Sequence, residues 1–350
     1  EPKLKEAKDF TLIGTDVPKL DTHAKTTGQA EYTMDVYREG METVVVAHPD
    51  KMGAVVASFD DTDALKVPGV IAVREIPQGV AVYAKTTGAA LKGREALQVT
   101  WDDSKAETRS SAQIYADFSR AAAEGGRAAE EVGDAMEVIE AEFHFPYLAH
   151  AALEPLDAVL EVTDGKAELW MGSQFPSLDK PTLAATLGVD PSDVQINVMF
   201  AGGSFGRRAQ PTAHVAAEVA EIAKAAGGNG SWKLLWTRED DMIGGYYRPL
   251  TVHKMKGGLD ADGNIVGWHD VVVNQSIMAG GPMEGMMKDG MDPTSYEGAT
   301  KMPYDLPALK VDWVRQDSPV SVLWWRSVGH SHTGYATEVF LDQLLEAGGK

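Results

Sequence analysis

The chain has 350 residues, no cysteine and a formal net charge of −20, because 52 acidic residues oppose 32 basic ones. Its acidity argues against a nucleic-acid partner, since phosphate binding needs a basic surface. Without cysteine, these residues cannot form disulfides, thiol nucleophiles, zinc–thiolate sites or protein-ligated iron–sulfur clusters. The length allows two or more domains.

The first hundred residues alternate strand and helix patterns. Apolar and alternating runs predict five strands, at residues 44–47, 54–57, 70–76, 80–84 and 97–101. Short helices are predicted between them, at residues 61–66 and 89–96. Two β-α-β passages in one stretch indicate a small α/β domain, which we place at residues 1–105.

A segment of different composition follows at residues 106–135, acidic overall and rich in alanine and glycine at its centre. Ser110 and Gln113 form a capping-box signature at the start of a helix. Ile114 and Phe118 lie on its single apolar stripe. This composition predicts a solvated helical linker.

Residues 136–350 carry mostly β signals. Two Asp-Gly pairs, Asp164-Gly165 and Asp262-Gly263, lie between alternating segments and predict hairpin turns. Apolar residues at helical spacing predict helices at 212–226 and 333–345. The fold class predicted for the whole chain is therefore α+β, with a mixed, β-rich second domain.

The most informative motif lies between a predicted strand and the helix at 212–226. It reads Gly202-Gly203-Ser204-Phe205-Gly206-Arg207-Arg208. Glycines let a backbone approach a ligand closely and point consecutive N–H groups at it. The helix N-terminus and the two arginines favour an anionic group such as pyrophosphate. The spacing is that of neither a P-loop nor Gly-x-Gly-x-x-Gly, so the motif alone also fits a plain tight turn.

Two metal sites are weaker alternatives. His150 and Glu154 lie four residues apart and could form a zinc site with other histidines, namely His144, His330 and His332. Pro146 and Pro155 argue against a helix there, so structural hydrogen bonds are the preferred role.

A methionine-rich stretch offers the second alternative. Methionines between residues 278 and 291 could hold a soft ion such as Cu(I). Because glycines are interleaved with them, an adaptable apolar loop is the preferred interpretation.

Taken together, four segments resemble the xanthine dehydrogenase/aldehyde oxidase superfamily. They are the glycine loop, His150 to Pro155, Trp170 to Gln174, and Trp324 to His332. Within it, the chain looks most like the large subunit of isoquinoline 1-oxidoreductase and of membrane-linked aldehyde dehydrogenases. The resemblance extends over essentially all 350 residues. It implies a hammerhead α/β domain at 1–105 and the first molybdopterin-binding domain at 136–350.

The resemblance also implies residue roles. Gln174 matches a glutamine that hydrogen-bonds a molybdenum oxo ligand. The expected cofactor contacts are Gln174, Gly202, Gly203, Ser204, Phe205, Gly206, Arg207, Arg208 and Gly329, and the expected substrate contacts are Trp325 and Arg326. No residue is expected to bind the metal directly. Ala209 stands where purine-oxidising relatives carry a carboxylate, so purine oxidation is not expected.

Two features of the family have no counterpart among these residues. The proton-abstracting glutamate belongs to a Gly-Glu motif that does not occur before Lys350, and the leading Gly-Gln-Gly segment is also missing. We therefore expect the chain to be an internal fragment of a larger subunit, with no catalytic residue of its own. Alone, it is expected to hold no cofactor and to be inactive.

The function implied by the resemblance is oxidation of an aldehyde or an N-heteroaromatic compound, with water as the oxygen source. The expected cofactor of the complete enzyme is molybdopterin cytosine dinucleotide. Its expected partners are the remainder of the large subunit, a small subunit with two 2Fe–2S clusters, and a cytochrome beyond it. A homodimer of the fragment is a further expectation. The expected compartment is the periplasm or the periplasmic side of a membrane, with the cytoplasm as the alternative. The rival function is a non-catalytic assembly or solute-binding module on the same fold.

Overall fold

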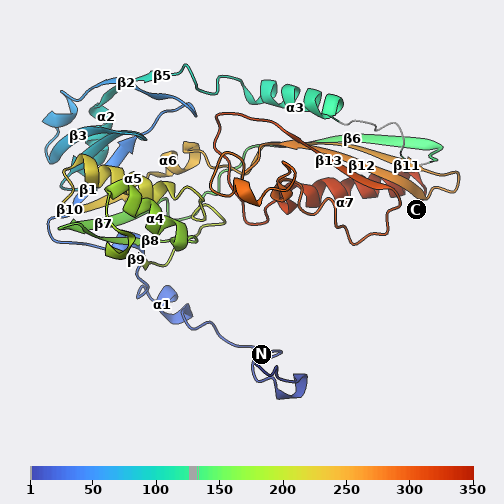
Figure 1. The fold of residues 1–350 in the computed structure, drawn as a ribbon, viewed down its shortest axis with the longest axis horizontal. Coiled ribbons are helices and arrows are strands. Elements are labelled where there is room, and N and C mark those ends of the chain that lie inside the picture. Colours follow the sequence, from blue (N-terminus) through green and yellow to red (C-terminus); the bar gives the residue numbers. More distant parts are fainter. Residues whose placement is uncertain (1, 126–131, 133) are drawn as a thin grey trace.

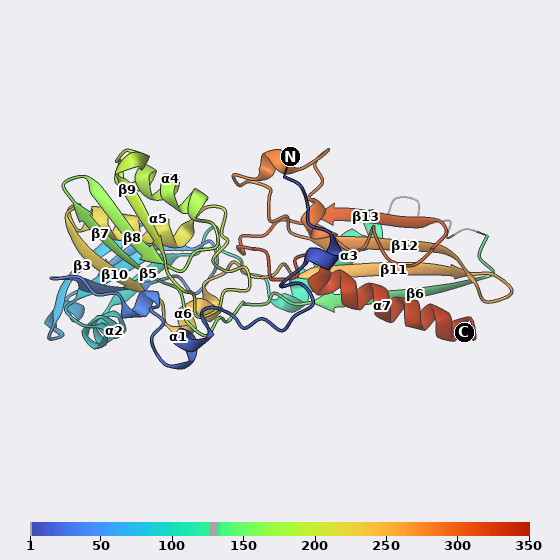
Figure 2. The same ribbon diagram turned by 90° about the horizontal axis from the view of Figure 1, so that it is seen from below.

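Two β-sheets, one in each of two lobes along a common long axis, organise the chain (Figures 1 and 2). The computed structural model describes residues 2–125, 132 and 134–350. An N-terminal arm with η1 (Ala7–Asp9) and α1 (Thr22–Thr26) extends away from the first lobe, as Figure 1 shows.

The first lobe is built on a seven-stranded sheet in the order β3-β4-β1-β10-β7-β8-β9. The strands are β3 (Val70–Ile76), β4 (Gly79–Ala84), β1 (Glu42–Ala47), β10 (Gly230–Leu235), β7 (Asp157–Thr163), β8 (Lys166–Met171) and β9 (Val194–Val198). Neighbours β1 and β10 are parallel, as are β8 and β9, and the other neighbours are antiparallel.

Both faces of this sheet are covered. Helices α4 (Pro176–Leu187) and α5 (His214–Ala225) cover one face, where Val44 packs with Leu160 and Ile222. Helix α2 (Thr87–Ala96) covers the other face, where Val45 packs with Val82. Because successive strand residues point to opposite faces, β1 needs apolar residues at consecutive positions, as its sequence has.

The strands predicted in the first hundred residues are confirmed. They do not pair only with one another, as the strands of a separate domain would. Strands β1, β3 and β4 share their sheet with four strands from beyond residue 150. Only β2 (Val55–Asp60) and β5 (Gln98–Asp102) pair with each other alone. The helix predicted at 61–66 is a single 3-10 turn, η3 (Ala64–Lys66). The domain boundary at residue 105 stays a prediction.

The second lobe is built on a four-stranded sheet in the order β13-β12-β11-β6. The strands are β13 (Leu309–Arg315), β12 (Ile265–Asn274), β11 (Thr251–Leu259) and β6 (Glu137–Phe145). Helix α7 (His330–Ala347) packs on one face, with Phe340 against Trp268 at a ring distance of 4.9 Å. Helix α3 (Ser111–Gly125) covers the opposite face.

The position of α3 corrects one expectation. Its predicted start is confirmed, because the Gln113 side chain accepts from the Ser110 backbone N–H at 2.7 Å. Ile114 and Phe118, however, are buried against strands β11 and β12. The helix is therefore a packed layer of the second lobe and is solvated only on its polar face. Residues 126–131 and 133 of the predicted linker lie outside the described residues.

Both predicted hairpin turns are present. Asp164 and Gly165 join β7 to β8 with φ of 50° and 80°, the signs that a type I′ turn requires. The turn between β11 and β12 is held by Asp260, whose carboxylate accepts from the N–H groups of Asp262 and Asn264 at 2.9 and 2.8 Å.

The remaining segments are short helices and long connections. They include η2 (Thr33–Asp35), η4 (Pro191–Asp193), α6 (Arg238–Ile243), η5 (Glu284–Met286) and η6 (Pro293–Ser295). The methionine-rich loop is partly buried, since Met278 is 5% exposed and Met286 is 59% exposed. Over the described part of the chain, no helix has the length and apolar character needed to cross a membrane.

Candidate functional site

The glycine loop adopts a conformation that requires its glycines. Gly203 and Gly206 have φ of 103° and 107°, and Phe205 lies in the left-handed region at 58°. A Cβ atom on Gly206 would lie 2.3 Å from the Trp324 carbonyl oxygen. The Arg326 N–H donates to the Phe205 carbonyl at 2.7 Å. Two segments that are far apart in the sequence, both predicted to border the cofactor, are therefore in direct contact.

Gln174 is joined to the same loop. The Ser204 hydroxyl donates to the Gln174 side-chain carbonyl and accepts the Arg208 backbone N–H at 3.1 Å. The Gln174 backbone N–H in turn donates to the Arg208 carbonyl at 3.1 Å. With its carbonyl engaged by Ser204, the exposed Gln174 side chain has its NH₂ group left to donate to a ligand.

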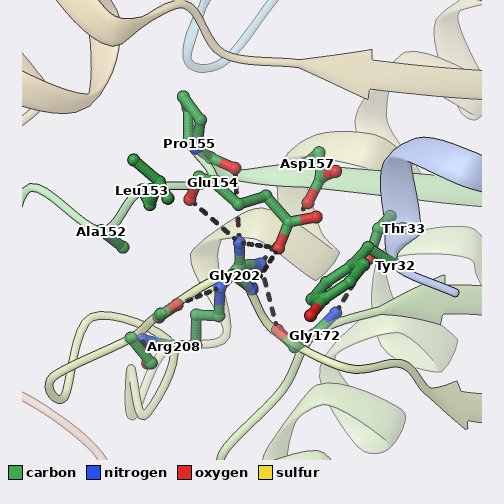
Figure 3. Close-up of polar contacts among 12 residues, drawn as sticks. Tyr32, Thr33, Ala152, Leu153, Glu154, Pro155, Asp157, Gly172, Gly202 and Arg208 are labelled. Atoms are coloured by element: carbon green, nitrogen blue, oxygen red, sulfur yellow. Dashed lines mark hydrogen bonds and ion pairs between the residues drawn. The ribbon is translucent and has the colours of Figure 1, made fainter. Parts of the chain in front are cut away.

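Arg208 holds the loop from inside (Figure 3). The guanidinium donates to the Gly172 and Gly203 carbonyls, both at 3.3 Å, and to the Glu154 carboxylate at 3.1 Å. That carboxylate also accepts the Gly202 N–H at 2.7 Å. Arg208 is only 5% exposed, so its N–H groups are used within the protein. The expectation that it touches the cofactor stays a prediction; the structure gives it a scaffolding role.

Glu154 and His150 both have the structural roles preferred from the sequence. His150 Nε2 donates to the Trp324 carbonyl at 2.7 Å. Burial lowers the pKa of His150 to about 4, which keeps the ring neutral. Together these contacts fix the 202–206 loop against Trp324. Thr33, which accepts the Gly172 N–H at 3.1 Å, was not predicted, because nothing in its local sequence distinguishes it.

The remaining predicted residues lie beside the loop in different environments. Arg326 is exposed, whereas Trp325 is half-buried and its indole N–H is buried with no partner among the described residues. Gly329 is buried where α7 begins, so close to Glu297 that a Cβ atom would lie 2.7 Å from its backbone nitrogen. The cofactor or substrate contacts expected of these three residues stay predictions.

Asp157, beneath the loop, is a buried carboxyl group with an unusual titration. It is 1% exposed and lies 3.5 Å from the Arg208 guanidinium. Neither of its oxygens has a hydrogen-bond partner among the described residues. Burial, and then repulsion by Glu154, raise the pKa of Asp157 to about 7 against the opposing effect of Arg208.

This shift predicts how stability depends on pH. Between its ordinary pKa of 3.8 and about 7, folded Asp157 keeps a proton that the unfolded chain has lost. The free energy of unfolding therefore falls as pH rises through this window and stays level above it. Asp157→Asn cannot ionise, so we expect it to melt above the wild type at about pH 8, with the gap closing toward about pH 4. Thermal melts across this range test it; a lower Tm for the variant at pH 8 would mean that pairing with Arg208 outweighs burial.

The donor chemistry of the site suits an oxygen-rich ligand. In the described structure, no hydrogen bond occupies the backbone N–H groups of residues 203–206, and the Gln174 NH₂ group lies beside them. Such a set of N–H donors fits an oxo or phosphate-type group approaching a glycine-lined backbone. No group of three or more His, Cys, Asp or Glu side chains in the described regions is arranged to hold a metal ion. The residues present therefore fit one side of a molybdopterin cofactor.

Comparison with known proteins agrees with this geometry. Residues 109–349 match the molybdopterin cofactor-binding domain family. The chain belongs to this family. It is 30% identical to isoquinoline 1-oxidoreductase subunit beta of Brevundimonas diminuta over 97% of the chain and 46% of that protein. It is also 31% identical to the membrane-bound aldehyde dehydrogenase (pyrroloquinoline-quinone) of Gluconacetobacter polyoxogenes over 97% of the chain and 47% of that protein. The family predicted from the sequence motifs is confirmed.

Solved structures of two oxidoreductases share the fold. Quinoline 2-oxidoreductase from Pseudomonas putida 86 superposes with a TM-score of 0.72 and 17% identity, covering 96% of this chain and 48% of that one. Aldehyde oxidoreductase from Desulfovibrio gigas gives a TM-score of 0.74 and 19% identity, covering 95% and 42%. The α+β, sheet-rich architecture is thus shared with these two oxidoreductases. The chain spans about half the length of the curated relatives it matches.

Proposed function

We propose that this chain forms one side of the cofactor site in a molybdenum hydroxylase that oxidises an aldehyde or an N-heteroaromatic compound with water as the oxygen source. The observation that supports this is the contact among Gln174, the 202–206 loop and the segment beginning at Trp324. The names of the relatives support the two substrate classes, isoquinoline-type heterocycles and aldehydes. The proposed cofactor is molybdopterin cytosine dinucleotide.

Each part of the chain would then have a definite task. The cofactor, when bound, supplies the two-electron redox centre. Gln174 would donate from its NH₂ group, oriented by Ser204, and the loop N–H groups would hold oxygen atoms of the ligand. Phe205, 41% exposed, would pack against the cofactor, and the exposed Arg326 would orient substrate. The proton-abstracting glutamate is proposed to belong to another part of the complete subunit.

The proposal extends to partners and architecture. The first 105 residues would be the hammerhead domain, contributing three strands to the larger sheet. A small subunit with two 2Fe–2S clusters would accept electrons, because a cysteine-free chain cannot ligate such clusters. A cytochrome as further acceptor, a periplasmic or periplasmic-membrane location and a homodimer of the isolated chain are also proposed.

Metal analysis tests the function directly. We expect the complete large subunit, purified with its partners, to contain near-stoichiometric molybdenum and to reduce a dye with aldehyde or isoquinoline. We expect the 350-residue chain alone to hold no molybdenum and to oxidise no aldehyde. The reason is that Gln174 and Phe205 face solvent here, where polar contacts to a charged ligand are screened and weak.

Each result has a clear reading. A complete subunit that never contains molybdenum or a pterin would defeat the proposed function and favour the non-catalytic module. Molybdenum and turnover in the 350-residue chain alone would show that the base lies within it. Ultraviolet–visible spectra of both preparations provide the independent check.

A further inference from the structure

The N-terminal arm, defined here as residues 2–30, is tied to the first lobe only at its root. Within the described residues, every hydrogen bond and ion pair of the arm joins two arm residues. The chain is first fixed to the lobe at Tyr32, which forms a parallel bridge with Phe200, and at Thr33, whose hydroxyl accepts the Gly172 N–H. Before this root the arm extends away from the lobe (Figure 1).

The arm carries large apolar side chains that nothing in the described structure covers. No residue from 2 to 20 is buried. The large apolar side chains of this stretch are each at least 41% exposed, namely Leu4, Phe10, Leu12, Ile13, Val17 and Leu20. Removing such side chains from water is favourable, and segments that stay solvated are poor in them. The composition of the arm is therefore typical of a segment that packs against another surface.

A second apolar surface lies where the arm meets the sheet. Strand β9 is the last strand of the seven-stranded sheet, and Val198 and Phe200 are 54% and 41% exposed. With Met199, Ala24 and Ala30 they help to line a mostly apolar cleft of about 570 Å³. We call Val198, Met199 and Phe200 the β9 rim. Because the cleft is lined from both sides, the arm and the β9 rim form one surface.

This surface borders the candidate site. The chain passes from Phe200 almost directly into the 202–206 loop. Arg207 is buried behind the loop, 3.2 Å from a ring nitrogen of His214, and Arg208 holds the loop from inside. Phe205, 41% exposed, is therefore the large side chain that the loop presents outward. A body that covers the β9 rim also lies next to this side of the loop.

A body of suitable size exists in the related proteins. The chain spans about half the length of the curated relatives it matches, so those proteins have a further region of similar size. A region tethered within the same polypeptide has an effective concentration in roughly the millimolar range. It would therefore occupy the surface in preference to a second copy of the chain.

We propose that the arm and the β9 rim form the surface on which the remaining part of the large subunit docks, beside the open side of the cofactor site. Large exposed apolar patches are typical of such interaction surfaces. The arm packs along the docked part, and the β9 rim extends the contact to the 202–206 loop. This inference deepens the proposed function, on which it rests for the chain being part of a larger subunit.

Hydrogen–deuterium exchange in the complete large subunit tests the inference. We expect the backbone amides of residues 10–20 to exchange at least about tenfold more slowly than in a free peptide of the same sequence, because packing makes opening less frequent. Leu12→Ser with Ile13→Ser should bring their exchange to within about threefold of the free peptide. Amine-reactive cross-linking identifies the occupant. Lys8 and Lys19 are expected to form cross-links with the remaining part of the same polypeptide.

Leu65→Ser with Ile71→Ser is the matched control. These two side chains are 47% and 43% exposed and belong to η3 and β3, at the opposite edge of the sheet from β9. Their loss should leave the exchange of the arm unchanged. An arm that exchanges like the free peptide in the wild type, or an equal loss of protection in the control, would overturn the inference.

Cross-links that join Lys19 only to a second copy, in a mixture of isotope-labelled and unlabelled subunits, would also overturn it. Because the wild-type arm is measured directly, the inference is decided even where a variant does not fold. Molybdenum content judges the proposed function separately. A protected arm cross-linked to the remaining part, in a subunit without molybdenum, would support the docking surface and defeat the proposed function alone.

Discussion

Replacing Gln174 by alanine in the complete enzyme is expected to lower turnover by about 10²-fold, the usual loss when one preorganised hydrogen-bond donor is removed. The Ser204 hydroxyl holds the Gln174 carbonyl, and the Arg208 carbonyl holds its backbone N–H. The Gln174 side chain is therefore oriented before any ligand binds. In Gln174→Ala, the ligand loses the NH₂ group as a hydrogen-bond donor. Steady-state kinetics with an aldehyde, together with molybdenum content, measure the effect.

The control for this prediction is Gln195→Ala. Gln195 is an exposed glutamine on β9, outside the loop and its contacts, and its loss should leave turnover within about twofold of the wild type. Wild-type turnover and full molybdenum content in Gln174→Ala would remove this residue from the site. A variant that lacks molybdenum would instead assign Gln174 to cofactor retention.

Arg208→Met is expected to lower the free energy of unfolding by about 3–5 kcal/mol, the cost of breaking a buried ion pair from one side. The methionine would leave the Glu154 carboxylate buried with the Gly202 N–H as its remaining donor. It would also leave the Gly172 and Gly203 carbonyls without their donor. Urea unfolding followed by tryptophan fluorescence measures the change as a lower midpoint at similar slope.

Arg120→Met serves as the exposed counterpart. Arg120 is 63% exposed and pairs with Asp117 across one helical turn, so its loss should change stability by no more than about 0.5 kcal/mol. A double variant, Arg208→Met with Glu154→Gln, should recover part of the loss, because the uncompensated charge is gone. An unchanged midpoint in Arg208→Met would mean that Arg208 does not hold the loop.

The local elements of the fold were predictable because each has its own sequence pattern. Apolar runs predicted the strands at 70–76 and 80–84, and the Ser110 capping box predicted the start of α3. Which strands pair across the chain was not predictable, since a buried strand such as β1 carries no mark of its partner. The burial of α3 was missed because the acidic, alanine- and glycine-rich composition of residues 106–135 as a whole indicated solvation, whereas the narrow apolar stripe of α3 decides its packing.

The sequence predicted which segments form the site. It did not predict the contacts among their side chains. Resemblance brought Gln174, the glycine loop and the 324–329 segment to the same site, and the structure shows their contacts. The sequence could not distinguish the roles of Arg207 and Arg208. The charge of each residue is known from its identity, whereas its contacts depend on segments far away in the chain. The Thr33 hydroxyl accepts the Gly172 backbone N–H. Many side chains can accept such a hydrogen bond, so the residue type at position 33 gave no signal.

The pairing of β1 with β10 has a consequence for the chain during its synthesis. Val44, Val45 and Val46 are essentially fully buried in the finished protein, yet Glu42 pairs with Trp232. At translation rates of about 5–20 residues per second, β1 waits on the order of ten seconds or longer before β10 leaves the ribosome. During that time the backbone N–H and C=O groups along one edge of β1, an apolar strand, are unpaired and can pair with other chains. The nascent polypeptide is therefore most exposed to aggregation, and most dependent on chaperones, while residues 100–230 are being made.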